Sequence, residues 1–285
     1  MTPPRTVQSS GAASSFLRRG PEAFGLPVCR LGLASHAGSE LTPADIHHAV
    51  DRGVNFLNWA GDEDVFSRTI AGLGARRRDV VVCVQFAARS GAEAATELAA
   101  ILAALHSDYV DILTLYYVES AEEWQTLIAP DGALPYCREV QRAGRVRRLG
   151  VTSHQRPLAT EMARSGLLDL LMIRYNAAHR GAEREVFPTT DALGMPVIAY
   201  TAMRWGALLR STPDDPPGFV VPPASAWYRF VLQSPSVTVT LAAPHSRAEL
   251  DEALTVLDSG PLDAADYERL AQHGQRVRRH GGGFP

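Results

Sequence analysis

The chain has 285 residues, of which 46% are hydrophobic and 21% charged, and its formal net charge is −3. This balance excludes a strongly basic surface for nucleic acid or an anionic membrane, and no apolar run reaches the ~18 residues needed to span a bilayer. We therefore expect a globular protein that acts on a small molecule, with a cytoplasmic location as the default. The length suits one α/β barrel or two ordinary domains.

The cationic side chains are of one kind, because all 28 are arginine and the sequence contains no lysine. Arginine is effectively never deprotonated, so no Schiff base and no tunable ammonium acid can be built here. Cys29, Cys83 and Cys137 lie far apart and, like the histidines and acids, lack metal-ligand spacing, so we expect no metal centre.

Short apolar runs alternate with helical patterns along most of the chain. Residues 1–19 are rich in Ser, Thr and Pro without an apolar signal region, and they are predicted to be a loose tail. Eight strands are predicted, several of them too apolar to have a solvated face, as in a parallel sheet covered by helices. They span residues 28–33, 55–58, 80–85, 109–115, 148–151, 170–175, 196–200 and 237–241.

Seven helices are predicted between and after these strands. The first, 42–52, has an N-cap candidate in Thr42, with Pro43 in its first turn and Gly53 after its end. Glycines also follow three of the others. The remaining helices are predicted at residues 92–106, 134–143, 157–165, 183–193, 224–233 and 248–257.

Eight strands with intervening helices predict a single (β/α)8 TIM barrel over residues 20–275. No GxGxxG motif follows the first strand, which argues against a Rossmann domain. Residues 211–223 contain five prolines and are expected to form either a lid over the site or a rigid surface connection. The segment 276–285 is expected to be a flexible tail.

Five segments of the chain carry short motifs that are similar, in the same order, to those of a known protein family. Residues 53–60 read GVNFLNWA and 77–82 read RRDVVV; DYVD follows at 108–111, GRVRRLGVTS at 144–153, and YTAM at 200–203 with Gly206 and Leu208 after it. In order and spacing these segments resemble the aldo-keto reductase superfamily, in which the counterparts read GVNFIDTA, DYIDL, GKVRxIGVSN and YSPLxxGxL. The resemblance covers about residues 27–257.

This resemblance implies a TIM barrel that binds NADPH and moves hydride between the nicotinamide and a carbonyl carbon. In that family a tyrosine donates the proton, beside a lysine, an aspartate and a histidine. The chain differs at all four places. The aspartate position is Asn58, the tyrosine position falls at Glu63, the lysine position at Gln85 and the histidine position at Tyr116. Asn58 and Gln85 carry amides that are able to hydrogen-bond each other, so both charges are lost together.

The resemblance also implies a site for NADP. Thr152 and Ser153 would hold the carboxamide and Tyr200 would stack on the nicotinamide, whereas Met172 stands where a glutamine is usual. The phosphates and adenine would be held by Thr201, Met203, Arg204, Arg247 and Glu252.

Three functions remain open from the sequence. The first is an oxidoreductase that acts on a small carbonyl or alcohol with NADPH, with Glu63 or Tyr116 as substitute proton donor. The second is a redox-neutral enzyme, such as a dehydratase, isomerase or cyclase, and the third is a non-catalytic protein on the same barrel. His154 and His179 are further candidates after strands, and Tyr117 is expected to point away from Tyr116 towards a helix.

Overall fold

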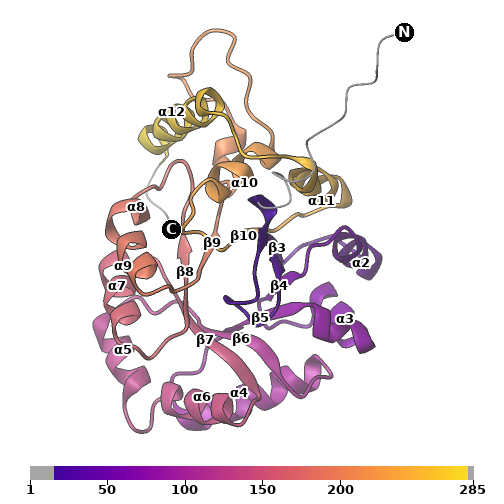
Figure 1. The fold of residues 1–285 in the computed structure, drawn as a ribbon, viewed down its shortest axis with the longest axis vertical. Coiled ribbons are helices and arrows are strands. Elements are labelled where there is room, and N and C mark those ends of the chain that lie inside the picture. Colours follow the sequence, from indigo (N-terminus) through magenta and orange to yellow (C-terminus); the bar gives the residue numbers. More distant parts are fainter. Residues whose placement is uncertain (1–15, 282–285) are drawn as a thin grey trace.

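The computed structural model describes residues 16–281 of the chain, and it is built around a closed barrel of eight parallel strands. The strands pair in the order β10-β3-β4-β5-β6-β7-β8-β9, and β10 closes the ring by pairing with β3. Figure 1 shows the helices as an outer ring around these strands. The predicted (β/α)8 barrel is therefore confirmed. Its strands are β3 (Leu31–Ala34), β4 (Phe56–Trp59), β5 (Val81–Phe86), β6 (Val110–Leu115), β7 (Val146–Ser153), β8 (Leu170–Arg174), β9 (Val197–Tyr200) and β10 (Val239–Ala242).

Side chains alternate between two separate apolar cores along each strand. On β8, Leu170 and Met172 belong to a core inside the barrel, whereas Leu171 and Ile173 belong to the larger core between the strands and the helices. This alternation follows from the twofold period of a strand. It explains why the strand segments are apolar almost throughout, since both faces are buried.

The helices follow the strands in turn. Several begin with a capping box, in which Thr42, Ser90 and Ser120 each accept a hydrogen bond from a backbone N–H in the first turn. The helices are α2 (Pro43–Asp51), α3 (Val65–Ala71), α4 (Gly91–Ala104), α5 (Ala121–Ile128), α6 (Ala133–Arg142), α7 (Arg156–Arg164), α8 (Ala182–Glu185), α9 (Phe187–Ala192), α10 (Ala224–Leu232), α11 (Arg247–Leu254) and α12 (Ala264–His280). Short 3-10 turns lie at Gly74–Asp79, Ala207–Leu209 and Thr255–Asp258.

The structure differs from the predicted helices in two respects. The segment 183–193 forms two helices, α8 and α9, because Pro188 has no N–H with which to continue the helix through Val186. In addition, α3, α5 and α12 were not predicted. Within the described residues, no helix is long and apolar enough to cross a membrane.

Part of each predicted tail is ordered. Strand β1 (Arg18–Arg19) pairs with β2 (Val28–Cys29), and the hairpin between them places Phe24 in the core inside the barrel, 5.5 Å from the ring of Phe56. Residues 1–15 and 282–285 lie outside the described part of the chain. At the other end, α12 continues to His280, because Val277 is buried and its carbonyl accepts a hydrogen bond from Arg204.

The proline-rich segment 211–223 is fixed to α12 by one buried carboxylate. Asp215 accepts hydrogen bonds from His273 Nδ1 at 2.9 Å, Arg276 Nε at 2.6 Å and the N–H of Thr212 at 2.6 Å. The imidazole of His273 is itself stacked on Phe219 from the same segment. These contacts favour the rigid connection among the two alternatives considered for this segment.

Candidate functional site

A pocket of about 690 Å³ opens at the carboxyl ends of the strands, where barrel proteins carry their sites. It extends from the barrel mouth to the segment before α11 and to the face of that helix that carries Glu249 and Glu252. Eight of the twelve residues expected at the site line it; seven of them come from five different strands or the segments directly after them, and the eighth lies on α11. These eight are Asn58, Gln85, Tyr116, Thr152, Tyr200, Thr201, Met203 and Glu252.

Two polar atoms in the pocket wall are buried without a partner. Asn58 Oδ1 and Thr152 Oγ1 make no hydrogen bond with any described residue, and each side chain belongs to a residue that is 2% exposed. No hydrogen bond is found between the amides of Asn58 and Gln85, contrary to expectation. A buried polar atom without a partner costs about 1–3 kcal/mol. Such atoms in a pocket indicate a place for a polar ligand group.

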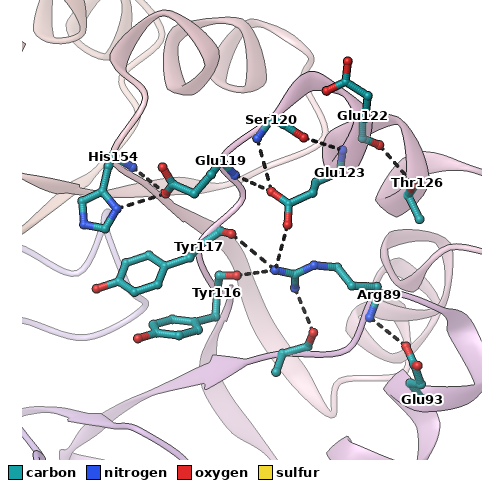
Figure 2. A network of polar contacts seen from close by, with 11 residues as sticks. Arg89, Glu93, Tyr116, Tyr117, Glu119, Ser120, Glu122, Glu123, Thr126 and His154 are labelled. Atoms are coloured by element: carbon teal, nitrogen blue, oxygen red, sulfur yellow. Dashed lines mark hydrogen bonds and ion pairs between the residues drawn. The ribbon is translucent and has the colours of Figure 1, made fainter. Parts of the chain in front are cut away.

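Tyr116 and Tyr117 both face the pocket, so the expectation that Tyr117 points away was wrong. Strand β6 ends at Leu115, and Tyr117 has a left-handed backbone with φ of 44°, which breaks the alternation of a regular strand. Arg89 holds this turn, since its Nη2 donates to the carbonyl of Tyr116 at 2.7 Å and lies 3.4 Å from that of Tyr117. As a result the two phenol rings lie against each other at a tilt of 31°, with their centroids 4.0 Å apart. Figure 2 shows the two rings side by side.

A histidine–glutamate pair lies beside these rings. His154 Nδ1 is 3.1 Å from Glu119 Oε1, which also accepts the N–H of His154, and the imidazole centroid is 4.5 Å from that of Tyr117 (Figure 2). Burial lowers the pKa of His154, although the adjacent Glu119 carboxylate opposes the shift. Burial therefore favours a neutral imidazole, and the contact with Glu119 favours the tautomer in which Nδ1 is the donor. Sequence reasoning singled out His154 but not Glu119, which lies 35 positions away and was not aligned with any motif.

Tyr200 forms the floor of the pocket at the end of β9. Its hydroxyl lies 3.4 Å from the carbonyl of Ser153, and its ring makes an edge contact with His154. Burial raises the pKa of the Tyr200 hydroxyl well above its usual range, so this phenol stays protonated. Ser153 itself is turned aside, because its Oγ accepts the N–H of Gln155.

Three further expected residues do not line the pocket. Glu63 is exposed and lines a separate groove between α3 and α4, together with Trp59, whose side chain belongs to the outer core and not to the core inside the barrel. The guanidinium of Arg204 donates to the carbonyl of Val277 on α12. Arg247 is paired with Asp45 at 3.0 Å and with Asp251 at 2.9 Å.

The outer end of the pocket has an acidic wall. Glu249 and Glu252 line it from one face of α11, together with His36 and His245. Glu252 Oε1 accepts the N–H of Ala224 at 2.6 Å, and Glu249 Oε2 accepts that of His245 at 2.8 Å. Among the described residues that line the pocket, none is an arginine.

The described residues contain no group of three or more His, Cys, Asp or Glu side chains that could hold a metal ion. All three cysteines are buried, and none of them forms a disulfide bond with another described residue. Fold and pocket together describe a (β/α)8-barrel protein whose candidate site is lined by aromatic rings, hydroxyls and amides at the carboxyl ends of its strands.

The chain belongs to the aldo/keto reductase family, whose sequence profile matches residues 39–221. Solved structures of the same fold include an aldo-keto reductase from Bacillus halodurans in its holo form, which is 20% identical with a TM-score of 0.69 and covers 91% of this chain and 95% of that one. An aldo-keto reductase from Klebsiella pneumoniae in complex with NADPH is 17% identical with a TM-score of 0.72, over 89% and 93% of the two chains. The glycerol dehydrogenase of Gluconobacter oxydans is 15% identical with a TM-score of 0.68, over 93% and 97%. No curated protein sequence matches the chain.

Proposed function

We propose that this protein is an oxidoreductase that binds a nicotinamide dinucleotide and acts on a small carbonyl or alcohol, without the family's lysine-dependent proton relay. The observation that carries the proposal is the pocket itself, in which a tyrosine ring and two unpartnered buried polar atoms lie together at the barrel mouth. Family membership and the NADPH-bound relative from Klebsiella pneumoniae support the class of cofactor.

The residues at the mouth fit the nicotinamide end of such a cofactor. The Tyr200 ring offers an aromatic face for stacking, and the Thr152 hydroxyl is able to both donate and accept a hydrogen bond to a carboxamide. When bound, the reduced nicotinamide supplies a hydride to a carbonyl carbon. Asn58 and Gln85 are neutral, so they would orient the substrate by hydrogen bonds and not by charge.

The proton for the carbonyl oxygen has to come from a side chain in the same pocket. Burial raises the pKa of Tyr117 above its usual range and that of Tyr200 likewise, so both are weak acids that act as fixed hydrogen-bond donors. Burial likewise raises the pKa of Tyr228, the fourth tyrosine that lines the pocket. We assign the proton transfer to Tyr116, which lies directly after β6. Glu63 is too far from the pocket wall to serve, since it lines a different groove.

A redox-neutral enzyme is the second candidate, and the pair of His154 and Glu119 favours it. A neutral imidazole whose Nδ1 is held by a carboxylate is a general base of the kind that dehydratases and isomerases need. This candidate does not require a dinucleotide, so cofactor binding separates the two.

The proposal is tested by titrating the protein with NADH and with NADPH and following quenching of tryptophan fluorescence. Replacement of Tyr200 by Ala is expected to weaken the dinucleotide by roughly 10- to 100-fold, because stacking on a base contributes about 1–3 kcal/mol, whereas Tyr200→Phe keeps the ring and most of the affinity. With a panel of small aldehydes, Tyr116→Phe is expected to lower turnover ~10²–10⁴-fold. Tyr136→Phe, on α6 away from the pocket, is the matched control. If neither dinucleotide binds at millimolar concentration, the proposal is wrong.

A further inference from the structure

The outer end of the pocket is lined by the carboxylates of Glu249 and Glu252. A phosphate group bound at this end would be stabilised by cations and repelled by these carboxylates. Glu249 and Glu252 are three positions apart on α11, and therefore present both carboxylates on one face of the helix, towards the pocket. Their hydrogen bonds from the N–H groups of His245 and Ala224 fix one oxygen of each carboxylate. In each, the second oxygen makes no hydrogen bond with a described residue, so it is available to accept one from a ligand.

The nearby arginines are already committed elsewhere. Arg247, in the first turn of the same helix, is bound by the carboxylates of Asp45 and Asp251. These bonds raise the pKa of the Arg247 guanidinium further and hold it against α2, outside the pocket wall. Arg204 is buried and donates to the end of α12.

The histidines at this end face acceptors as well. His36 has its two ring nitrogens 2.9 Å from the carbonyl of Ala37 and 3.2 Å from that of Pro244. His245 Nε2 lies 3.5 Å from Glu40 Oε1. The outer end of the pocket is thus lined by two histidines and the carboxylates of Glu249 and Glu252, with no arginine among the described lining residues. Glu40 adds a third carboxylate next to His245.

We propose that the pocket selects a dinucleotide without a 2′-phosphate, that is, NADH over NADPH, through Glu249 and Glu252. This inference rests on the proposed function and specifies its cofactor. A carboxylate accepts a hydrogen bond from a ribose 2′-hydroxyl, whereas a 2′-phosphate, with a charge between −1.5 and −2 at pH 7, is repelled by it. The unpartnered Asn58 Oδ1 and Thr152 Oγ1 at the inner end of the same pocket mark it independently as a ligand site.

The test is a pair of binding titrations with NADH and NADPH at pH 8, above the range in which histidine ordinarily ionises. NADH is expected to bind on the order of tenfold more tightly, as two carboxylates near a phosphate in partly solvated surroundings would produce. The double variant Glu249→Gln with Glu252→Gln keeps the size of both side chains and one acceptor oxygen in each but removes the charges, so it should bring the two affinities together. Glu249→Arg should reverse the order, and Glu161→Arg, an exposed change on α7, should leave the ratio as it is.

The outcomes separate this inference from the proposed function. Equal affinities in the unaltered protein, or tighter binding of NADPH, would overturn the preference while leaving an oxidoreductase with a dinucleotide. A ratio that the double glutamine variant does not change would show that these carboxylates are not the cause. Failure of both dinucleotides to bind removes the proposed function and the inference with it. Circular dichroism of each variant confirms that the barrel is folded.

Discussion

Thr152 and Thr240 each bury a hydroxyl in the barrel without a hydrogen-bond partner among the described residues, but only Thr152 lines the pocket. In both cases the unmade hydrogen bond is a cost to stability. We infer that a ligand supplies the missing partner of Thr152, whereas Thr240 on β10 is not among the residues that line the pocket.

Replacement of either threonine by valine should therefore raise the free energy of unfolding by about 1 kcal/mol, because an unpaired hydroxyl is replaced by a methyl group of similar size. Thr152→Val should in addition weaken the dinucleotide about five- to tenfold, the amount of one neutral hydrogen bond. Thr240→Val is the control and should leave the affinity unchanged. Urea denaturation and fluorescence titration measure the two quantities. Equal affinities for both variants would mean that Thr152 does not contact the ligand.

Some residues of the site could be predicted from the sequence and others could not, and the reason is local backbone geometry. Asn58, Gln85 and Tyr200 face the mouth because they lie on regular strands, where alternation decides which way a side chain points. Tyr117 follows a strand end with a positive φ, so alternation gave the wrong direction. Arg247 was expected near a phosphate, but its partner Asp45 is 202 positions away, a distance that no local pattern reveals.

At the scale of elements, the segment 211–223 and helix α12 are joined through two adjacent aspartates in different surroundings. Asp215 has a side chain that is 5% exposed, whereas Asp214 is 42% exposed and pairs with Arg279 and His280. Burial of Asp215 disfavours its charge, but hydrogen bonds from Thr212, His273 and Arg276 outweigh burial and lower its pKa to about 2. The buried aspartate should thus hold the two elements together.

We predict that Asp215→Asn lowers the free energy of unfolding by about 3 kcal/mol, because it leaves the buried His273 and the partly buried Arg276 without their anionic acceptor. Asp214→Asn, one residue earlier, removes only solvated ion pairs and should cost less than about 1 kcal/mol. Urea denaturation at pH 7 compares the two, and hydrogen exchange reports whether residues 211–223 loosen. A loss at Asp214 equal to that at Asp215 would show that this buried carboxylate is not what fixes the segment.

A capping signal alone did not decide which helices could be predicted, since α5 begins with a capping box at Ser120 and was nevertheless missed. Helix α2 begins after Thr42 as expected, since Thr42, Pro43 and Asp45 together form a start signal. Helix α12 has the longest span of all, yet its polar residues and the glycine at 274 conceal it in the sequence. That glycine is needed, because a Cβ there would lie 2.4 Å from the backbone of Ala177. Helix α12 is held in place by tertiary contacts, which include the hydrogen bond from Arg204 to the carbonyl of Val277.

At the scale of the whole molecule, the eightfold alternation of strands and helices was enough to predict the closed barrel, because hydrophobic period and element order leave few other architectures. The charge balance of the pocket, in contrast, could not be predicted from the order of elements along the sequence. It depends on which acid each arginine reaches in three dimensions, so 28 arginines in the sequence yield none among the described lining residues of the pocket.

The same arrangement of charges determines how the stability of the barrel depends on pH. Burial, followed by the charges of Arg174, Arg204, Arg278 and Arg156, lowers the pKa of His179 to about 3, and burial also lowers that of His154. In the unfolded chain these imidazoles bind protons near pH 6.5. The unfolded state therefore takes up more protons than the folded state as the pH falls from 6.5 towards 3, and the folded state loses stability over this window.

A second loss of stability follows at lower pH from carboxylates such as Asp215. The folded pKa of Asp215 lies below the unfolded value, so its stabilisation is present above about pH 4 and disappears as the pH falls towards 2.

We predict that the free energy of unfolding falls between pH 7 and pH 5, and that His179→Gln removes about 1 kcal/mol of this fall. His47→Gln, on α2, is the control and should keep the full dependence. The measurement is urea denaturation at pH 7, 6 and 5 at constant ionic strength. A His179→Gln protein with the same pH dependence as the unaltered chain would contradict the assignment, because the depressed imidazole would then not be the group that takes up the proton on unfolding.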